Sequence, residues 1–268
     1  MQKRMKNSSD TWNSEHYKKY ASFQNHEWAL AALFDHVTFN GDETILDIGC
    51  GDGNLTAKIA QKVPSGSVIG IDLSTSMIKA AQQSFNAVAN LSFEIADATS
   101  FSFKQKFDYV TSFFVLHWIE DQLTVLKNIK KALKPNGKTI IIMSAVQEDS
   151  PIILKAFERL EQEGLWVSTV KKANKRHFPQ STKDFEQLLH QAGFCHKQIT
   201  VVERASSTLS LEAAVQTLMR WVPHSTELPY EQALKFAQAL GGAMYKQLNK
   251  KPEESISFLQ HFLLIVAW

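Results

Sequence analysis

The sequence of 268 residues contains only two cysteines, Cys50 and Cys195. Two cysteines cannot supply the framework of several disulfides that stabilises small secreted domains. No CxxC pair is present, so the usual ligand spacing of a structural zinc site is also missing. We therefore predict a protein that folds around a hydrophobic core, in a reducing cytoplasmic setting and without a bound metal.

Charge of one sign and long apolar runs are also scarce. The 29 lysines and arginines barely exceed the 27 aspartates and glutamates, and this excess is too small to favour nucleic acid as a partner. Residues 1–12 are polar and contain no apolar stretch of the length found in signal peptides. The longest apolar runs, such as 140–143, are too short to cross a bilayer. We expect no membrane segment.

Short apolar segments alternate with helical patterns along the first half of the chain. Strands are predicted at 44–48, 67–71, 91–96, 107–115 and 138–144, with helices at 55–63, 74–89 and 121–133 between them. The KPNG sequence at 134–137 predicts a turn before the fifth strand. Five strands that alternate with helices predict a doubly wound, parallel α/β sheet.

The second half of the chain has a less regular pattern. Strands are predicted at 198–203 and 257–266, and helices at 150–164, 182–192, 211–221 and 230–248. The helix at 150–164 is expected to begin with Ser150 as its N-cap and Pro151 at its first position. Residues 167–180 are polar and basic, and we expect a loop or a mobile lid there.

We predict one domain, because an α/β chain of this length needs no second core. The helices at 14–37, 150–164 and 211–248 exceed what the sheet needs, and we interpret them as a helical cap over the ends of the strands. The expected core comprises about 38–148, 182–204 and 255–268, and the expected cap comprises 1–37, 149–181 and 205–254.

The strongest motif, LDIGCGDGNL at 46–55, lies between a predicted strand and a predicted helix. Its glycines allow the backbone to turn tightly and to approach a ligand. The dinucleotide pattern GxGxxG would place its third glycine at position 54, where Asn54 stands, and GxxxxGK[ST] is absent. Neither a pyrophosphate nor a triphosphate is favoured, which disfavours a nicotinamide-dependent oxidoreductase. S-Adenosylmethionine carries no phosphate, and its amino acid part can hydrogen-bond to such a loop.

Acidic residues stand near the ends of three successive predicted strands, at Asp47, Asp72 and Asp97. Asp72 can accept hydrogen bonds from ribose hydroxyls, and Asp97 can accept one from an exocyclic amine such as adenine N6. Each has an alternative, structural interpretation. Asp47 can hold the loop by accepting backbone N–H groups, Asp72 can cap a helix, and Asp97 can stabilise a turn.

The segment 47–53, the two later acids and the KPNG turn together resemble class I S-adenosylmethionine-dependent methyltransferases, over roughly residues 40–145. The resemblance implies a seven-stranded, mostly parallel sheet whose last strand is antiparallel. It implies that the cofactor is contacted by Gly49, Cys50, Gly51 and Gly53 at its methionine part, by Asp72 at its ribose and by Asp97 and Ala98 at its adenine. We also expect cofactor contacts from Leu73, Met77 and Phe113, and from Tyr17 and Tyr20, which with Trp12 would close over the cofactor.

The fourth predicted strand runs into His117 and Trp118, at the lip of the expected acceptor pocket. Alternatively, both residues pack under the following helix. The Asn/Asp-Pro-Pro-aromatic sequence typical of enzymes that methylate exocyclic amines of bases or glutamine amides is absent here. That class of acceptor is therefore disfavoured.

Outside the core, the segments 12–20, 220–230 and 258–267 resemble trans-aconitate and juvenile hormone acid methyltransferases, which methylate carboxylates of small molecules. Malonyl-acyl carrier protein methyltransferase shares much of the same core. The resemblance implies a small-molecule carboxylate as the acceptor, with Arg220 and Trp221 as further pocket candidates.

An anionic acceptor also needs positive partners. Cationic candidates besides Arg220 are Lys171, Lys172, Lys175, Arg176, His177 and Arg204, although a basic run is more often a solvated face. Other acceptors, such as a carrier protein or RNA, and a cofactor-binding protein without activity remain alternatives. We expect a monomer or a homodimer.

Overall fold

The computed structural model describes residues 23–146, 152–205 and 209–268. Its strands are β1 (Thr44–Ile48), β2 (Ser67–Asp72), β3 (Leu91–Ile95), β4 (Phe107–Phe113), β5 (Leu133–Ser144), β6 (Lys197–Ala205) and β7 (Leu259–Ala267). Its helices are α2 (Phe23–His36), α3 (Asn54–Ala60), α4 (Thr75–Phe85), the short 3-10 helix η1 (Leu116–Trp118), α5 (Gln122–Ala132), α6 (Ile152–Gln162), α7 (Val167–Asn174), α8 (Thr182–Gln191), α9 (Leu211–Leu218), α10 (Val222–Thr226) and α11 (Tyr230–Gln247).

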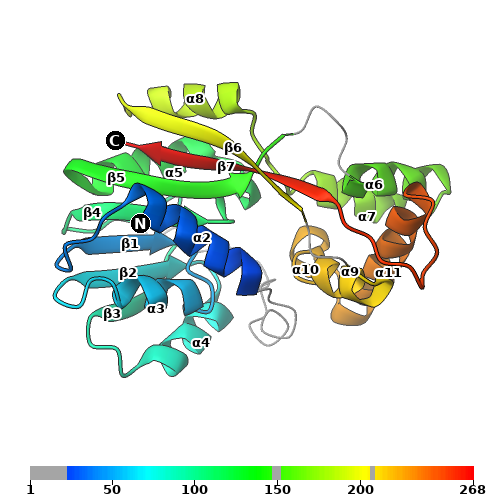
Figure 1. The fold of residues 1–268 in the computed structure, drawn as a ribbon, viewed down its shortest axis with the longest axis horizontal. Helices are drawn as coiled ribbons and strands as arrows, with labels where there is room; N and C mark the ends of the chain where they lie inside the picture. The colour runs from blue at the N-terminus through cyan, green and yellow to red at the C-terminus, as the bar shows by residue number, and fades with distance from the viewer. Residues whose placement is uncertain (1–22, 147–151, 206–208) are drawn as a thin grey trace, which may run out of the picture.

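The strands form one seven-stranded sheet in the order β3-β2-β1-β4-β5-β7-β6 (Figure 1). Strands β1 to β5 pair in parallel, and β7 runs antiparallel to both β5 and β6. The predicted doubly wound sheet with an antiparallel last strand is thus confirmed. The strand order reverses between β1 and β4, so the switch point, where ligands bind in such sheets, lies beyond their carboxyl ends.

The sheet is covered on both faces by apolar side chains. One buried cluster joins the sheet to α5 and α8, with Phe107, Phe185 and Ile265 among its members. The other joins it to α2 and α3, with Leu33 and Ile45 among its members. Parallel strands that are buried on both faces read as continuous apolar runs. This explains why the strands were recognisable from the sequence.

Helix α2 packs on the sheet and not with the cap helices, so its expected place in the cap is corrected. Ala29, Leu30 and Leu33 are buried in the same cluster as Ile45 and Phe262 of the sheet. The spacing of these residues places them on one side of a helix. Apolar periodicity predicts such a stripe, but it does not identify the surface that the stripe covers.

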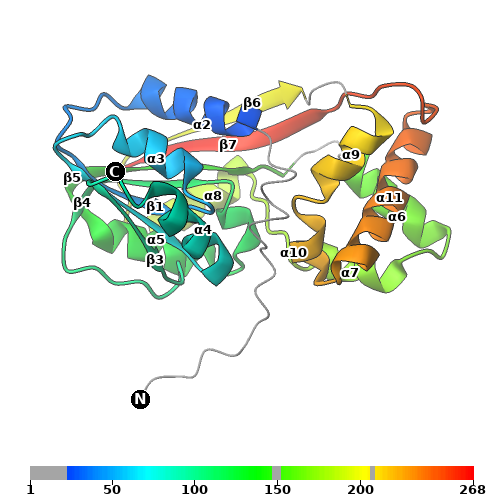
Figure 2. The same cartoon turned by 90° about the horizontal axis from the view of Figure 1, so that it is seen from below.

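A second group of helices, α6, α7, α9, α10 and α11, lies beyond the carboxyl ends of the parallel strands (Figures 1 and 2). We call it the helical group. It surrounds an apolar cluster of its own, in which Phe236, Leu240 and Tyr245 are buried. The hydroxyl of Tyr245 approaches the carbonyls of Leu209 and Glu254, at 2.8 and 3.1 Å, which ties α11 to the segments that flank it.

The expected loop or lid at 167–180 is partly wrong, because its first half forms α7. Val170 and Ala173, three residues apart, are buried in the helical group, whereas Lys171 and Lys175 point outward. Because most residues of 167–180 are polar, the short amphipathic pattern of Val170 and Ala173 was not recognised from the sequence. The KPNG turn also differs from its prediction, since these residues lie within β5, with Asn136 in a left-handed conformation. The expected start at Ser150-Pro151 lies outside the described residues.

None of the helices in the described ranges combines the length and the apolarity needed to span a bilayer.

Candidate functional site

The glycine loop leaves β1 in a conformation that only glycine adopts readily. Gly49, Gly51 and Gly53 all have left-handed φ angles, of 72°, 56° and 81°. A Cβ atom on Gly49 would lie 2.2 Å from Cγ2 of Val115, and one on Gly53 would lie 2.6 Å from the ring of Phe93. A Cβ on Gly51 would meet no atom within 4 Å. The middle of the loop therefore has an open side, while its two ends are packed tightly against the protein.

Asp72, at the end of β2, is hydrogen-bonded to this loop. Its Oδ2 accepts a hydrogen bond from the backbone N–H of Gly51 at 3.0 Å, and its Oδ1 accepts one from that of Ser74 at 2.8 Å. The N-cap of α4 is Ser74, whose hydroxyl accepts a hydrogen bond from Met77 N. Asp72 is thus not the helix cap. A carboxylate oxygen can accept more than one hydrogen bond, so these contacts are compatible with a further ligand.

Asp47 has a structural position inside the protein. It is 3% exposed, and its two oxygens accept hydrogen bonds from the hydroxyls of Thr56, at 2.6 Å, and Thr111, at 2.8 Å. Burial raises the pKa of Asp47 to about 6, the two hydroxyls oppose this shift, and the charge of Asp72 adds to it. Asp47 therefore joins β1 to α3 and β4, through side-chain hydroxyls and not through the backbone N–H groups that we considered from the sequence.

Asp97 and Ala98 follow β3 at the same edge of the sheet. Oδ1 of Asp97 accepts hydrogen bonds from the backbone N–H and the hydroxyl of Thr99, at 2.8 and 2.7 Å. Its Oδ2 makes no hydrogen bond with any residue that the structure describes. The carbonyl of Ala98 accepts a hydrogen bond from the Asn128 side chain at 3.2 Å. Asp97 thus stabilises a turn and still has one oxygen available.

The remaining cofactor candidates differ in what they can present to a ligand. Leu73 is 57% exposed, next to Asp72. Cys50, Met77 and Phe113 are buried, and Cys50 packs against Ile78 and Phe93. Burial raises the pKa of the Cys50 thiol well above its usual value, so this thiol is not an activated nucleophile. Tyr17, Tyr20 and Trp12 lie outside the described residues.

His117 is fixed by two hydrogen bonds at the end of β4. Its Nδ1 accepts a hydrogen bond from the backbone N–H of Ser144 at 3.2 Å, and its carbonyl accepts one from Phe178 N at 2.7 Å. Because the Nδ1 lone pair is occupied, the neutral ring carries its proton on Nε2. Gln122 strengthens the same junction, since its side-chain N–H group contacts the carbonyls of Leu116 and Phe178.

Trp118 lies at the centre of a cluster of rings between the sheet and the helical group. We call it the ring cluster, and it comprises His117, Trp118, His177, Trp221 and His224. The ring of Trp118 lies 5.0 Å from that of His117, 5.1 Å from that of His177 and 5.3 Å from that of His224. Trp221 stacks on Trp118 at 6.5 Å. The predicted pocket residues 117, 118 and 221 are therefore brought together, and Trp118 contacts the helical group through His224 of α10.

The imidazoles of the ring cluster are held in their neutral form. Burial lowers the pKa of His177 to about 4 and that of His224 to about 3, with Arg176 lowering and Glu227 raising the latter. The pKa of His117 lies well below its usual value, because it is buried and because His177 and His224 are close. Within the described ranges, no three His, Cys, Asp or Glu side chains are grouped so that they could hold a metal ion.

Four of the predicted cationic residues take three different places. Lys172 and Arg176 both pair with Glu227, the former at 2.6 Å, so they connect α7 to the end of α10. Arg204 lies over the ring of Trp28, 4.7 Å from its centroid. Arg220, beside Trp221 in sequence, has a buried Nε that finds no hydrogen-bond partner among the described residues. Among these four residues, Arg220 is therefore the one whose buried Nε–H group could donate a hydrogen bond to a ligand.

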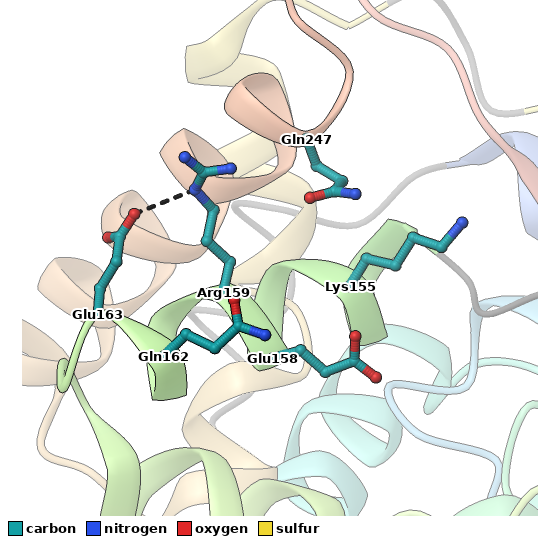
Figure 3. Close-up of a pocket in the computed structure, with 6 residues that line it drawn as sticks. All are labelled: Lys155, Glu158, Arg159, Gln162, Glu163 and Gln247. Atoms are coloured by element: carbon teal, nitrogen blue, oxygen red, sulfur yellow. Dashed lines mark hydrogen bonds and ion pairs between the residues drawn. The ribbon is translucent and has the colours of Figure 1, made fainter.

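A hollow of about 400 Å³ opens elsewhere, on the helical group (Figure 3). It is lined by side chains of α6, of the residue that follows α6 and of α11, namely Lys155, Glu158, Arg159, Gln162, Glu163 and Gln247. Arg159 and Glu163 form an ion pair at 3.0 Å on its rim. None of the predicted site residues lines this hollow.

Comparison with known proteins identifies the family. Residues 39–193 match the model of a methyltransferase domain, and the chain belongs to this family. It is similar to a methyltransferase-like protein of Invertebrate iridescent virus 6, with 34% identity over 53% of the chain and 52% of that protein. It is also similar to trans-aconitate 2-methyltransferase of Azoarcus, with 29% identity over 50% of the chain and 51% of that protein. The chain thus spans about half the length of each of these two relatives.

A longer match links the chain to juvenile hormone acid O-methyltransferase of Drosophila melanogaster, with 23% identity over 85% of the chain and 80% of that protein. Among solved structures, YcgJ of a Bacillus species has a TM-score of 0.63 at 16% identity and covers 90% of this chain and 98% of its own. A Haemonchus contortus phosphoethanolamine N-methyltransferase, solved with S-adenosylhomocysteine, has a TM-score of 0.61 at 20% identity, covering 95% and 56%. The predicted membership of a methyltransferase family is confirmed.

Sequence patterns did not reveal Val115, His224 or Gln122 as residues of the site. Val115 contacts the glycine loop, but an apolar residue at the end of an apolar strand has no distinguishing pattern. His224 joins the ring cluster from α10, more than a hundred residues after Trp118. These residues meet only in the folded chain.

The buried imidazoles predict a loss of stability in mild acid. Between pH 6.5 and the depressed folded-state pKa of each histidine, the unfolded chain binds a proton that the folded chain does not, at about 1.4 kcal/mol per pH unit for each group. Their contribution is complete above pH 6.5 and declines as the pH falls toward 4. Asp47 acts oppositely, because its raised pKa lets the folded chain bind a proton between about pH 6 and 4. Urea unfolding at pH 7.5, 6 and 5 measures the balance.

A matched pair of variants assigns this pH dependence to the ring cluster. His177→Asn combined with His224→Asn is expected to give a flatter dependence of the unfolding free energy on pH, and the exposed His190→Asn serves as the control. Equal slopes for the double variant and the wild type would contradict the assignment.

Proposed function

We propose that this methyltransferase transfers the methyl group of S-adenosylmethionine to a carboxylate oxygen of a small molecule. The names of the trans-aconitate and juvenile hormone acid relatives support this acceptor class. The observation that carries the proposal is the ring cluster, which places neutral imidazoles and indoles beyond the end of β4, just after Val115, the residue that packs against Gly49 of the glycine loop.

In the proposed site, the cofactor lies along the edge of the sheet formed by the ends of β1, β2 and β3. The open side of Gly51 faces the methionine part, and Asp72 accepts hydrogen bonds from the ribose hydroxyls. Leu73 offers an exposed apolar surface to the adenine ring, and Oδ2 of Asp97 accepts a hydrogen bond from its amine. Cys50 contributes its backbone, while Met77 and Phe113 shape the site from within.

A carboxylate acceptor suits the electrostatics of the ring cluster. A carboxylic acid with a pKa near 4 is ionised at neutral pH, so its oxygen attacks without a general base. The new O–CH₃ bond forms as the S–CH₃ bond breaks, and an anion and a sulfonium become an ester and a neutral thioether. Because charge disappears in this step, a desolvated pocket that disfavours charge favours the reaction. Alignment of the two reactants is expected to supply most of the rate enhancement.

The geometry of His117 agrees with a reaction that has no general base. Its Nδ1 is occupied by Ser144 N–H, so the ring can offer only its Nε2–H as a donor. We propose that this donor, together with the unsatisfied Nε of Arg220, orients the carboxylate. Trp118 and Trp221 then form the apolar wall of the acceptor pocket.

The cofactor site is tested by Asp72→Ala. Because the change removes hydrogen bonds to a charged group, each worth about 1.5–3 kcal/mol, we expect S-adenosylhomocysteine to bind at least about tenfold more weakly. Glu94→Ala, an exposed acid on the neighbouring strand β3, is the matched control and should leave the affinity unchanged. Isothermal titration measures both. Unchanged binding by Asp72→Ala, or binding of NAD by the wild type with no binding of S-adenosylhomocysteine, would contradict the proposed site.

The acceptor class is tested with cofactor labelled in its methyl group. We expect label to be transferred to members of a panel of small carboxylic acids and not to the matching carboxamides, because an amide has no anionic oxygen. Carrier-protein thioesters and RNA are included as the other acceptors. Transfer to RNA or to an amine, with no transfer to any acid, would contradict a carboxylate acceptor.

His117→Asn tests the absence of a general base. Asparagine keeps an acceptor for Ser144 N–H and removes the Nε2–H donor. Loss of a general base typically costs about 10²–10⁴-fold, so we expect a smaller loss of kcat than this range, and a kcat that does not vary from pH 6.5 to 8.5. The measurement is kcat against pH for the best acid of the panel. A fall of many orders of magnitude, with KM and cofactor affinity unchanged, would show that His117 is the base.

A further inference from the structure

Phe114 leaves β4 in a backbone conformation that a bulky aromatic residue rarely adopts. Its φ angle is 62°, in the left-handed region, where the Cβ atom crowds the following carbonyl. Its backbone N–H still donates to the carbonyl of Ile142 at 2.7 Å, so the residue remains anchored to β5. Strand β4 therefore stays hydrogen-bonded to β5 up to Phe114, where the backbone changes direction abruptly.

This change of direction sends the next residues toward both halves of the proposed site. Val115 lies so close to Gly49 that a Cβ on that glycine would be 2.2 Å from its side chain. The turn of η1 follows at once, with Trp118 N–H donating to the Val115 carbonyl at 2.8 Å and Ile119 N–H to that of Leu116 at 3.0 Å. One backbone conformation thus seats Val115 on the cofactor loop and carries His117 and Trp118 into the ring cluster.

The side chain of Phe114 points to the other side, into an aromatic clamp. The clamp consists of Phe114, Trp28 of α2 and Phe262 of β7. Its rings are separated by 5.8 Å between Phe114 and Trp28, 5.5 Å between Phe114 and Phe262 and 5.2 Å between Trp28 and Phe262. The guanidinium of Arg204, from β6, lies over the ring of Trp28. Strained residues persist where surrounding contacts over-determine them, and such residues concentrate at functional sites.

We propose that Phe114 is a positioning residue, whose clamped ring holds the left-handed backbone that seats Val115 against the glycine loop and so sets the affinity for the cofactor. The inference rests on the proposed place of the cofactor beside that loop. It assigns to α2, β6 and β7, which hold no proposed ligand contact, a part in forming the site.

Two substitutions separate this role from simple packing. Phe114→Ala and Phe114→Gly both delete the ring and open the clamp. Alanine keeps the Cβ that disfavours the left-handed conformation, whereas glycine adopts it without that penalty. If Phe114 only fills space, the two variants behave alike. If it holds the backbone, glycine preserves the site and alanine does not.

The first readout is isothermal titration with S-adenosylhomocysteine. We expect binding about tenfold weaker for Phe114→Ala and within about threefold of wild type for Phe114→Gly. Trp166 provides a matched control pair, because it is an aromatic residue at φ 56° in the helical group. Trp166→Ala and Trp166→Gly should both bind as the wild type does. Equal affinities for the two Phe114 variants would overturn the proposal.

The second readout is hydrogen exchange at the amides of Trp118 and Ile119, which does not depend on any ligand. Exchange is expected to be faster in Phe114→Ala than in Phe114→Gly, and equal rates would overturn the proposal. A wild type that binds no S-adenosylhomocysteine would instead refute the proposed cofactor site, and exchange would still decide the role of Phe114. Should Phe114→Ala fail to fold, Trp28→Leu replaces it, with faster exchange expected in that variant than in Trp28→Leu combined with Phe114→Gly.

Discussion

Asp47 is buried where the strand order reverses, and its carboxylate accepts hydrogen bonds from Thr56 of α3 and Thr111 of β4. These bonds fix β1, which precedes the glycine loop, to α3, which follows it, and to the neighbouring strand β4. Burying the carboxylate is costly, as its raised pKa of about 6 shows, and the two hydroxyls offset only part of that cost. The ends of the loop are held as well, because Gly49 packs against Val115 and Gly53 packs against Phe93. The rest of the site is built on this fixed point.

The parts of the fold that local pattern determines were predictable. The alternation of apolar runs and helical stripes predicted the parallel sheet, and the glycine spacing predicted the loop between β1 and α3. The hydrogen bond from this loop to Asp72 was not predicted. Prediction failed where the structure depends on which surface of the protein covers the apolar face of a helix. Val170 and Ala173 make α7 amphipathic only because the helical group covers them, and α2 covers the sheet because Ile45 and Phe262 accommodate it. The left-handed Phe114 has no sequence signal, since its ring packs against Trp28 of α2 and Phe262 of β7, which are both distant in sequence.

The two sides of the site differ in their electrostatics. Carboxylates gather at the ends of β1, β2 and β3, whereas the ring cluster beyond β4 contains three imidazoles that burial keeps neutral. In the helical group, the positive charges of Lys172 and Arg176 are paired within the protein, because both side chains bind Glu227. In the proposed site, a cationic cofactor would therefore lie among acids and an anionic acceptor among neutral donors. In such an arrangement each ligand would have its own binding groups, and the groups that bind one would not neutralise the charge of the other.

Burial shifts the pKa values of Asp47 and His117 away from their charged forms, and nearby groups of like charge add to both shifts. Part of the rise in the Asp47 pKa comes from the charge of Asp72, so a sulfonium bound nearby would favour ionisation of both acids. An anion in the ring cluster would likewise raise the depressed histidine pKa values. In the proposed site, each ligand thus favours the charged form of the groups that burial holds neutral or partly protonated. In the proposed reaction, the sulfonium becomes a thioether and the carboxylate becomes an ester, so this electrostatic effect is lost once the methyl group has moved. The charges that favour binding of the reactants therefore do not hold the products, which favours their release.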